Sequence, residues 1–138
     1  MKRKLVDTNV IIRFLVEDPG KVHRKFRGVF TFFPRVERGE VRVLLLDLVV
    51  FEAFFVLKSV YDVPEKTAAQ KLGEIVAFRG MEMQDKPTML RCLSLLETEK
   101  IDLVDAYLLA SAEALSFKEV FSFDKDLAKR GLACVNPE

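Results

Sequence analysis

Four acidic side chains stand where their types and spacing could support chemistry. They are Asp7, Glu52, Asp105 and Asp124. Asp7 directly follows a short apolar segment that is typical of a buried strand, and Asp124 follows a later one. In an open α/β sheet, ligands bind beyond the carboxyl ends of the strands, so both acids are candidate site residues. The alternative role of each is to cap the helix that follows it.

Glu52 and Asp105 are predicted to lie on apolar faces of helices. The residues three and four positions from Glu52 are Leu48, Val49, Phe55 and Val56. Asp105 shares its face with Leu108 and Leu109, so both carboxylates are expected to project from apolar stripes. A buried carboxylate stays ionised when a cation or hydrogen-bond donors compensate it. Alternatively, Glu52 extends from the edge of a core helix, and Asp102 and Asp105 form a capping box.

If the fold brings these four acids together, they repel one another strongly unless a cation is bound. Oxygen-only ligands favour the hard cations Mg²⁺ and Mn²⁺ over zinc. Mg²⁺ held by few carboxylates keeps water molecules that can be directed at a phosphoryl group, which makes phosphodiester hydrolysis the natural hypothesis. The glycine-rich loops with which nucleotide enzymes hold phosphates are absent from the sequence.

The elements that must position these acids alternate between strands and helices. Apolar runs predict strands at residues 4–6, 42–46, 81–83, 119–123 and 132–135. Helical spacing predicts helices at residues 9–16, 21–38 with a break at Pro34, 48–60, 65–79, 88–97, 103–116 and 125–130. The alternation is typical of an α/β domain with a mostly parallel sheet covered on both faces. Residues 1–138 contain no evident linker or repeat and are expected to form one domain.

The composition fits a globular domain. Half of the 138 residues are hydrophobic, 31% are charged and the net charge is +1, which excludes intrinsic disorder. No apolar run approaches the roughly 18 residues that span a bilayer, and no secretory signal precedes Asp7, so we expect a soluble, cytoplasmic protein without a membrane partner. One histidine and two widely spaced cysteines argue against a zinc site or a disulfide framework.

Charge is divided unevenly along the chain. Residues 21–42 contain seven Lys or Arg against two Glu, whereas residues 97–126 contain eight acidic residues against three Lys. A nucleic acid could be held by the basic segment while carboxylates act on its backbone. Solvated helix faces would produce the same distribution, so both interpretations stay open.

Four short motifs, in this order, resemble those of PIN-domain ribonucleases. They are Val6-Asp7-Thr8-Asn9-Val10, Val49-Val50-Phe51-Glu52-Ala53, Asp102-Leu103-Val104-Asp105-Ala106 and Ser122-Phe123-Asp124-Lys125-Asp126. The resemblance covers nearly the whole chain. The compact length and the Asp-x-x-Asp-Ala segment are most similar to the VapC-type toxins of bacterial and archaeal toxin–antitoxin pairs.

The resemblance implies a three-layer α/β/α sandwich with a mostly parallel sheet, dependence on Mg²⁺ or Mn²⁺, and endonucleolytic cleavage of RNA. The family's acidic, metal-holding residues are matched by Asp7, Glu52, Asp105 and Asp124. Asn9 matches an asparagine that would support Asp7, and Ser122 stands where the family more often has threonine. An antitoxin partner and a homodimer are also implied.

We therefore expect a metal-dependent endoribonuclease, the toxin of a toxin–antitoxin pair. Two alternatives stay open: a PIN-like module that binds RNA or protein without cleaving it, and an RNA-processing nuclease without an antitoxin. A phosphoacceptor receiver domain would not suit the inward-facing Glu52 and Asp105. Residues 26–33 are richer in phenylalanine than expected for the family. This indicates either an aromatic surface covered by another chain or ordinary core packing.

Overall fold

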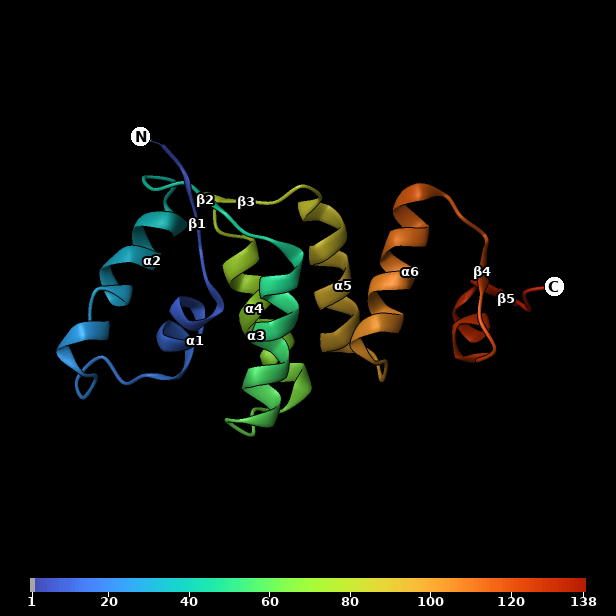
Figure 1. Cartoon of the computed structure of the whole chain (residues 1–138), viewed down its shortest axis with the longest axis horizontal. Helices are drawn as coiled ribbons and strands as arrows, with labels where there is room; N and C mark the ends of the chain where they lie inside the picture. The colour runs from blue at the N-terminus through green and yellow to red at the C-terminus, as the bar shows by residue number, and fades with distance from the viewer. Residues whose placement is uncertain (1) are drawn as a thin grey trace.

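The computed structural model describes residues 2–138, and its secondary structure follows the predicted alternation (Figure 1). The strands are β1 (Lys4–Leu5), β2 (Val43–Leu44), β3 (Met81–Glu82), β4 (Glu119–Phe121) and β5 (Ala133–Val135). The α-helices are α1 (Thr8–Val16), α2 (Val29–Glu37), α3 (Asp47–Ser59), α4 (Glu65–Val76), α5 (Lys86–Thr98) and α6 (Leu103–Leu115). Two 3₁₀ helices are η1 (Arg24–Phe26) and η2 (Asp126–Arg130). Within residues 2–138, no helix is both long and apolar enough to cross a membrane.

The strands form two separate parallel sheets. β2 lies between β1 and β3, with Leu5 beside Leu44 and Leu44 beside Glu82. β4 pairs with β5, and Phe121 lies beside Val135. The predicted α/β class with parallel strands is confirmed. The expected single sheet is instead divided, because β1 and β4 do not pair in this structure.

The core consists of apolar side chains from the helices and from the three-stranded sheet. Its largest fully buried members include Ile11, Phe33, Leu45, Phe54, Leu57, Leu72, Met81, Met89 and Leu93. Burying a side chain of this size contributes about 1.5–3 kcal/mol to the free energy of unfolding. This packing fixes α1 and α3 against the sheet and thereby places Asp7 and Glu52.

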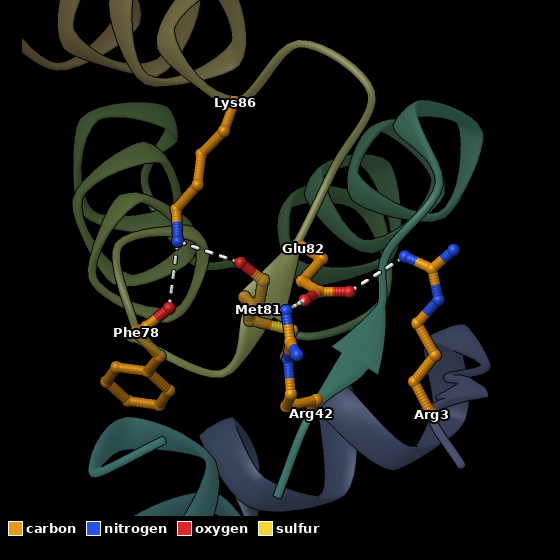
Figure 2. Close-up of polar contacts among 6 residues, drawn as sticks. All are labelled: Arg3, Arg42, Phe78, Met81, Glu82 and Lys86. Atoms are coloured by element: carbon orange, nitrogen blue, oxygen red, sulfur yellow. Dashed lines mark hydrogen bonds and ion pairs between the residues drawn. The ribbon is translucent and has the colours of Figure 1, made fainter.

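A polar cluster ties the three strands of the first sheet together (Figure 2). The Glu82 carboxylate accepts hydrogen bonds from Arg3, which precedes β1, at 2.8 Å, and from Arg42, which precedes β2. Lys86 Nζ donates to the carbonyl oxygens of Phe78 and Met81, each at 2.8 Å, and burial lowers its pKa. Because both arginines are largely exposed, their ion pairs with Glu82 contribute at most about 1 kcal/mol each.

The prediction that the helical segment 21–38 breaks at Pro34 is wrong. The helical segment breaks between η1 and α2, and Pro34 lies inside α2. Proline cannot donate the hydrogen bond that this position would make to the Phe30 carbonyl, which costs about 3 kcal/mol in a helix interior. The side chains of Phe33 and Val36 are fully buried in the core. Their packing holds the helix continuous through the proline.

The last third of the chain extends away from the three-stranded sheet. Figure 1 shows α6 packed beside α5, with β4 and β5 at the far end of the molecule from β1. Arg91 of α5 pairs with Glu113 of α6 at 3.0 Å, and the Tyr107 hydroxyl donates to Asp47 of α3 at 2.6 Å. Arg130 donates to the Lys100 carbonyl at 3.2 Å, which joins η2 to the α5–α6 loop. These contacts keep β4 away from β1.

Candidate functional site

Asp7 lies at the carboxyl end of β1, as the sequence predicts, and its side chain also begins α1. The backbone N–H of Thr8 donates to Asp7 Oδ1 at 2.7 Å, so the capping role is present as well. The Asp7 side chain is exposed and able to meet a ligand. Thr8 itself is buried, and its hydroxyl is the one buried side-chain polar atom without a hydrogen-bond partner in residues 2–138.

A groove of about 880 Å³ runs along β1, and Asp7 and Asn9 line it. Its apolar lining residues include Leu5, Val29, Phe32, Val41 and Val43. Its cationic lining residues are Lys2, Lys4, Arg13, Lys25, Arg35 and Arg42. Asp7 is the one acidic residue of this lining. The lining of the groove therefore combines apolar side chains with six cations, which attract anionic ligands.

Two of these cations lie close to one aromatic ring of the same lining, that of Phe26. The Arg13 guanidinium lies 3.8 Å above the centre of the Phe26 ring, and Lys25 Nζ lies 5.7 Å from it. Arg13 also pairs with Glu17 at 2.6 Å. Sequence reasoning missed Arg13, although its position four residues after Asn9 in a helix places both on one face. Lys25 belongs to the basic segment that the sequence identified.

The prediction that Glu52 is buried is wrong, because its side chain is exposed. The apolar stripe around it faces solvent, with Leu48 77% and Phe55 48% exposed. The opposite face of α3 enters the core through Ala53, Phe54 and similar residues. Helical spacing correctly grouped Glu52 with apolar neighbours but did not show whether another element covers them. Glu52 and its neighbours line a shallow surface groove distinct from that of Asp7.

Asp105 lies in a third place, in an acidic recess at the start of α6. Burial raises the pKa of Asp105, and repulsion by Asp102, Asp124 and Asp126 raises it further, while Arg130 opposes them. The recess, of about 480 Å³, is lined by Asp102, Asp105 and Asp126 together with Lys100 of the α5–α6 loop and Lys129 and Arg130 of η2. Of the four predicted acids, Asp105 and Asp124 are thus the two whose charges influence each other.

Two acids near Asp105, Asp102 and Asp124, accept hydrogen bonds from backbone N–H groups. The backbone N–H of Asp105 donates to Asp102 Oδ1 at 2.9 Å, so Asp102 begins α6, as one alternative predicted. The N–H of Asp126 donates to Asp124 Oδ1 at 3.1 Å. The Ser122 hydroxyl accepts from the N–H of Asp124 at 3.0 Å and therefore shapes the turn that presents this carboxylate.

The structure therefore distributes the four acids over three places. Within residues 2–138, no three His, Cys, Asp or Glu side chains come close enough to hold a metal ion. The oxygen donors suit Mg²⁺ or Mn²⁺ by type, but in this arrangement a single chain does not bring them around one cation. What the chain does assemble is a basic groove beside Asp7 and an acidic recess beside Asp105 and Asp124.

The phenylalanine-rich segment packs mainly within its own chain. Phe33 is fully buried and stacks on Phe14 with ring centres 4.5 Å apart, and Phe30 lies 6.0 Å from the same ring. Phe26 is half-buried beneath Arg13. Ordinary core packing thus explains most of this segment. The large apolar side chains that remain exposed lie elsewhere, on β1, α3, α6 and β4.

Comparison with known proteins gives one family. A model of the PIN domain matches residues 4–132, which spans both the basic groove and the acidic recess. No curated protein matches the chain. The match includes all four predicted acids within one domain unit, although the structure places them in separate parts of the chain.

Proposed function

The chain belongs to the PIN domain family, whose members are generally nucleases, and from this we propose that it is a metal-dependent endoribonuclease. We further propose that it acts as the toxin of a toxin–antitoxin pair, which the similarity of its motifs to VapC-type toxins supports. RNA is the substrate, and an antitoxin protein is the partner. The acids proposed to hold Mg²⁺ or Mn²⁺ are Asp7, Glu52, Asp105 and Asp124.

The observation that carries the proposal is the position of Asp7 within the basic groove along β1. An RNA backbone carries one negative charge per nucleotide, and Lys or Arg side chains that neutralise phosphates supply much of the binding free energy. Lys25 and Arg13 line the same groove as Asp7, and Phe26 offers an aromatic ring beside them. A strand held there has its phosphates beside a candidate metal-binding carboxylate.

Four polar residues besides the acids have a role in this proposal. Lys25 and Arg13 neutralise phosphates and orient the strand, and Asn9, on the same lining as Asp7, supports the position of that carboxylate. Ser122 holds Asp124 through the turn described above. A divalent cation bound by such carboxylates supplies an acidified water molecule and neutralises charge on phosphoryl oxygens.

The proposal is tested by incubating purified protein with RNA and mapping the ends of the products. We expect cleavage with Mg²⁺ or Mn²⁺, none with EDTA, and a loss of at least about a hundredfold in Asp7→Asn. Asparagine also caps helices, so this variant keeps its fold. Equal cleavage by wild type and Asp7→Asn would contradict the assignment of Asp7.

A second measurement examines the groove. Lys25→Ala should weaken RNA binding and reduce the salt dependence of the binding constant by about one charge. The matched control is Lys71→Ala, which removes an exposed lysine from α4 outside the groove. Equal losses in both variants would indicate that the groove does not bind RNA.

The separation of the acids favours one alternative, a PIN module that binds RNA without cleaving it. Binding without metal-dependent cleavage in the assay above would support that alternative.

The toxin assignment requires a further experiment in cells. Expression of wild type, but not of Asp7→Asn, should arrest growth, and the product of a neighbouring small reading frame should relieve the arrest. Cleavage without growth arrest would instead indicate an RNA-processing nuclease.

A further inference from the structure

Among residues 2–138, the outer strands of the two sheets are β1 and β3 in the three-stranded sheet and β4 and β5 in the two-stranded sheet. We consider the edges of β1 and β4, since an acid of the proposed site follows each of these strands. Apolar side chains beside these edges are exposed: Leu5 is 64%, Phe121 75% and Phe123 82% exposed. An open, apolar strand edge readily pairs with another strand. The edges of β1 and β4 are therefore able to pair with each other.

The chain's own β4 cannot reach its own β1 in this arrangement. Helices α3 to α6 lie between the two strands in Figure 1. Ala106 and Ala110 of α6 are fully buried, and Arg91 and Tyr107 fix α6 to the rest of the molecule as described above. Bringing β4 to β1 within one chain would require α6 to leave this packing. A second copy needs no such change.

We infer that β4 of a second copy of this chain pairs in parallel with β1, and that the active site is completed across the two copies. Each chain then supplies Asp7 and Glu52 to one site and Asp105 and Asp124 to the other. Such an exchange is isologous, so one dimer contains two identical sites. Placing Asp7 and Asp105 in one site rests on the proposed function, whereas the strand pairing rests on the structure alone.

The choice of β4 and of parallel pairing follows from the acids. Asp7 comes two residues after β1, and Asp124 comes three residues after β4. Parallel neighbours are about 4.8 Å apart and end at the same edge of a sheet, so pairing of β1 with β4 brings Asp7 close to Asp124. Asp105 already lies within electrostatic range of Asp124. The buried Thr8 hydroxyl next to Asp7 lacks a partner, as expected beside an incomplete site.

The two surfaces are complementary in apolar character. The lining of the groove along β1 includes apolar side chains, against which the exposed Phe121 and Phe123 would pack, together with six cations. Near β4, the acids Glu119, Asp124 and Asp126 are interspersed with Lys118, Lys125 and Lys129, so charge does not select this pairing. The cations of the groove that β4 does not cover are left to bind RNA.

Cross-linking between single-cysteine chains tests the pairing without reference to activity. Leu5→Cys and Phe121→Cys are prepared separately in a Cys134→Ser background, mixed, co-refolded and treated with a short bis-maleimide that tolerates a register shift of one residue. We expect a covalent heterodimer. The matched control mixes Phe121→Cys with Val60→Cys, an exposed position at the end of α3, and should give little product.

A double variant distinguishes exchange between chains from closure of one chain. Leu5→Cys/Phe121→Cys in one chain should also yield covalent dimers. A covalently closed monomer, or no product in the mixed sample, would overturn the inference. Cross-linking equal to that of the Val60→Cys control would do the same.

Mixing two inactive variants tests the shared site. Asp7→Asn and Asp105→Asn are each inactive under the proposal, but a co-refolded equal mixture contains one intact site in every mixed dimer, which predicts about a quarter of wild-type cleavage. No recovery, with wild type active and cross-linking positive, would overturn the shared site. If wild type itself does not cleave RNA, the proposed function fails, and cross-linking alone decides the pairing.

Discussion

Asp105 is an acidic side chain whose ionisation the fold opposes. Burial and three neighbouring carboxylates raise its pKa above the ordinary value of 3.8. A carboxyl with a raised pKa in the folded state destabilises the protein once it ionises, and this penalty disappears as pH falls below its ordinary pKa. Ionised Asp105 thus lowers stability near neutral pH, which is common for residues kept for function.

Asp105→Asn should therefore raise the thermal midpoint in EDTA at pH 7, by a few degrees at most, because it removes this repulsion. The difference in thermal midpoint between variant and wild type should shrink toward pH 3, where Asp105 of the wild type is protonated. Millimolar Mn²⁺ should stabilise wild type more than the variant, because a proposed ligand is missing. Thermal unfolding with EDTA and with Mn²⁺ measures both effects. An equal shift with Mn²⁺ in both proteins would contradict the role of Asp105 in metal binding.

The two cysteines should differ in reactivity. Cys92 is fully buried in α5, and burial raises the pKa of its thiol to about 12, with a smaller contribution from Asp47. The thiolate is the reactive form, so Cys92 should remain unmodified at pH 8, whereas the half-buried Cys134 reacts. Titration with a thiol reagent should give one fast thiol in the native protein and two after denaturation. Two fast thiols in native protein would mean that α5 opens readily.

At the scale of elements, Gly80 determines how the start of β3 fits beside α2. Its N–H donates to the Val36 carbonyl at 2.8 Å, and a Cβ added at this glycine would lie 2.7 Å from the same oxygen and press on the Val41 carbonyl. Backbone atoms on both sides cannot move aside easily. The contact holds the end of α2 to the first sheet and thus shapes the basic groove.

Gly80→Ala should lower the free energy of unfolding by about 2 kcal/mol or more, because it overpacks this contact. Gly28→Ala is the matched control: no heavy atom lies within 4 Å of an added Cβ there, and the backbone is already helical. This control should be neutral or more stable by up to about 1 kcal/mol. Urea unfolding compares the two. A neutral Gly80→Ala would show that α2 is not pressed against the β3 turn.

At the scale of the whole molecule, an exchanged dimer makes stability depend on concentration. When a folded dimer unfolds to two separate chains, its apparent free energy of unfolding rises by about 1.4 kcal/mol per dimer for each tenfold rise in protein concentration. We expect the thermal midpoint to rise between about 1 and 100 µM protein. Phe121→Ser, which alters an exposed residue of β4, should abolish this rise and give a monomer in light scattering. A midpoint that does not depend on concentration would contradict a dimer.

The sequence by itself determined the local structure of this protein. Strands and helices were placed within a few residues, and the capping role of Asp102 was foreseen, because both depend on the spacing of neighbouring residues and on short-range hydrogen bonds. The α/β class followed from the alternation of these elements. The motifs identified the family, and the match over residues 4–132 confirms it.

Only the tertiary structure decided which of these elements meet. The apolar face around Glu52 was predicted to be buried. An apolar stripe on a helix shows only that another element could cover it, and no element within residues 2–138 does so here. The separation of β4 from β1 likewise depends on the packing of α6 against α5. The spacing of apolar side chains along a helix does not show which other helix they contact. The same local pattern fits an acidic site within one chain or across two, because strand pairing is set by long-range packing.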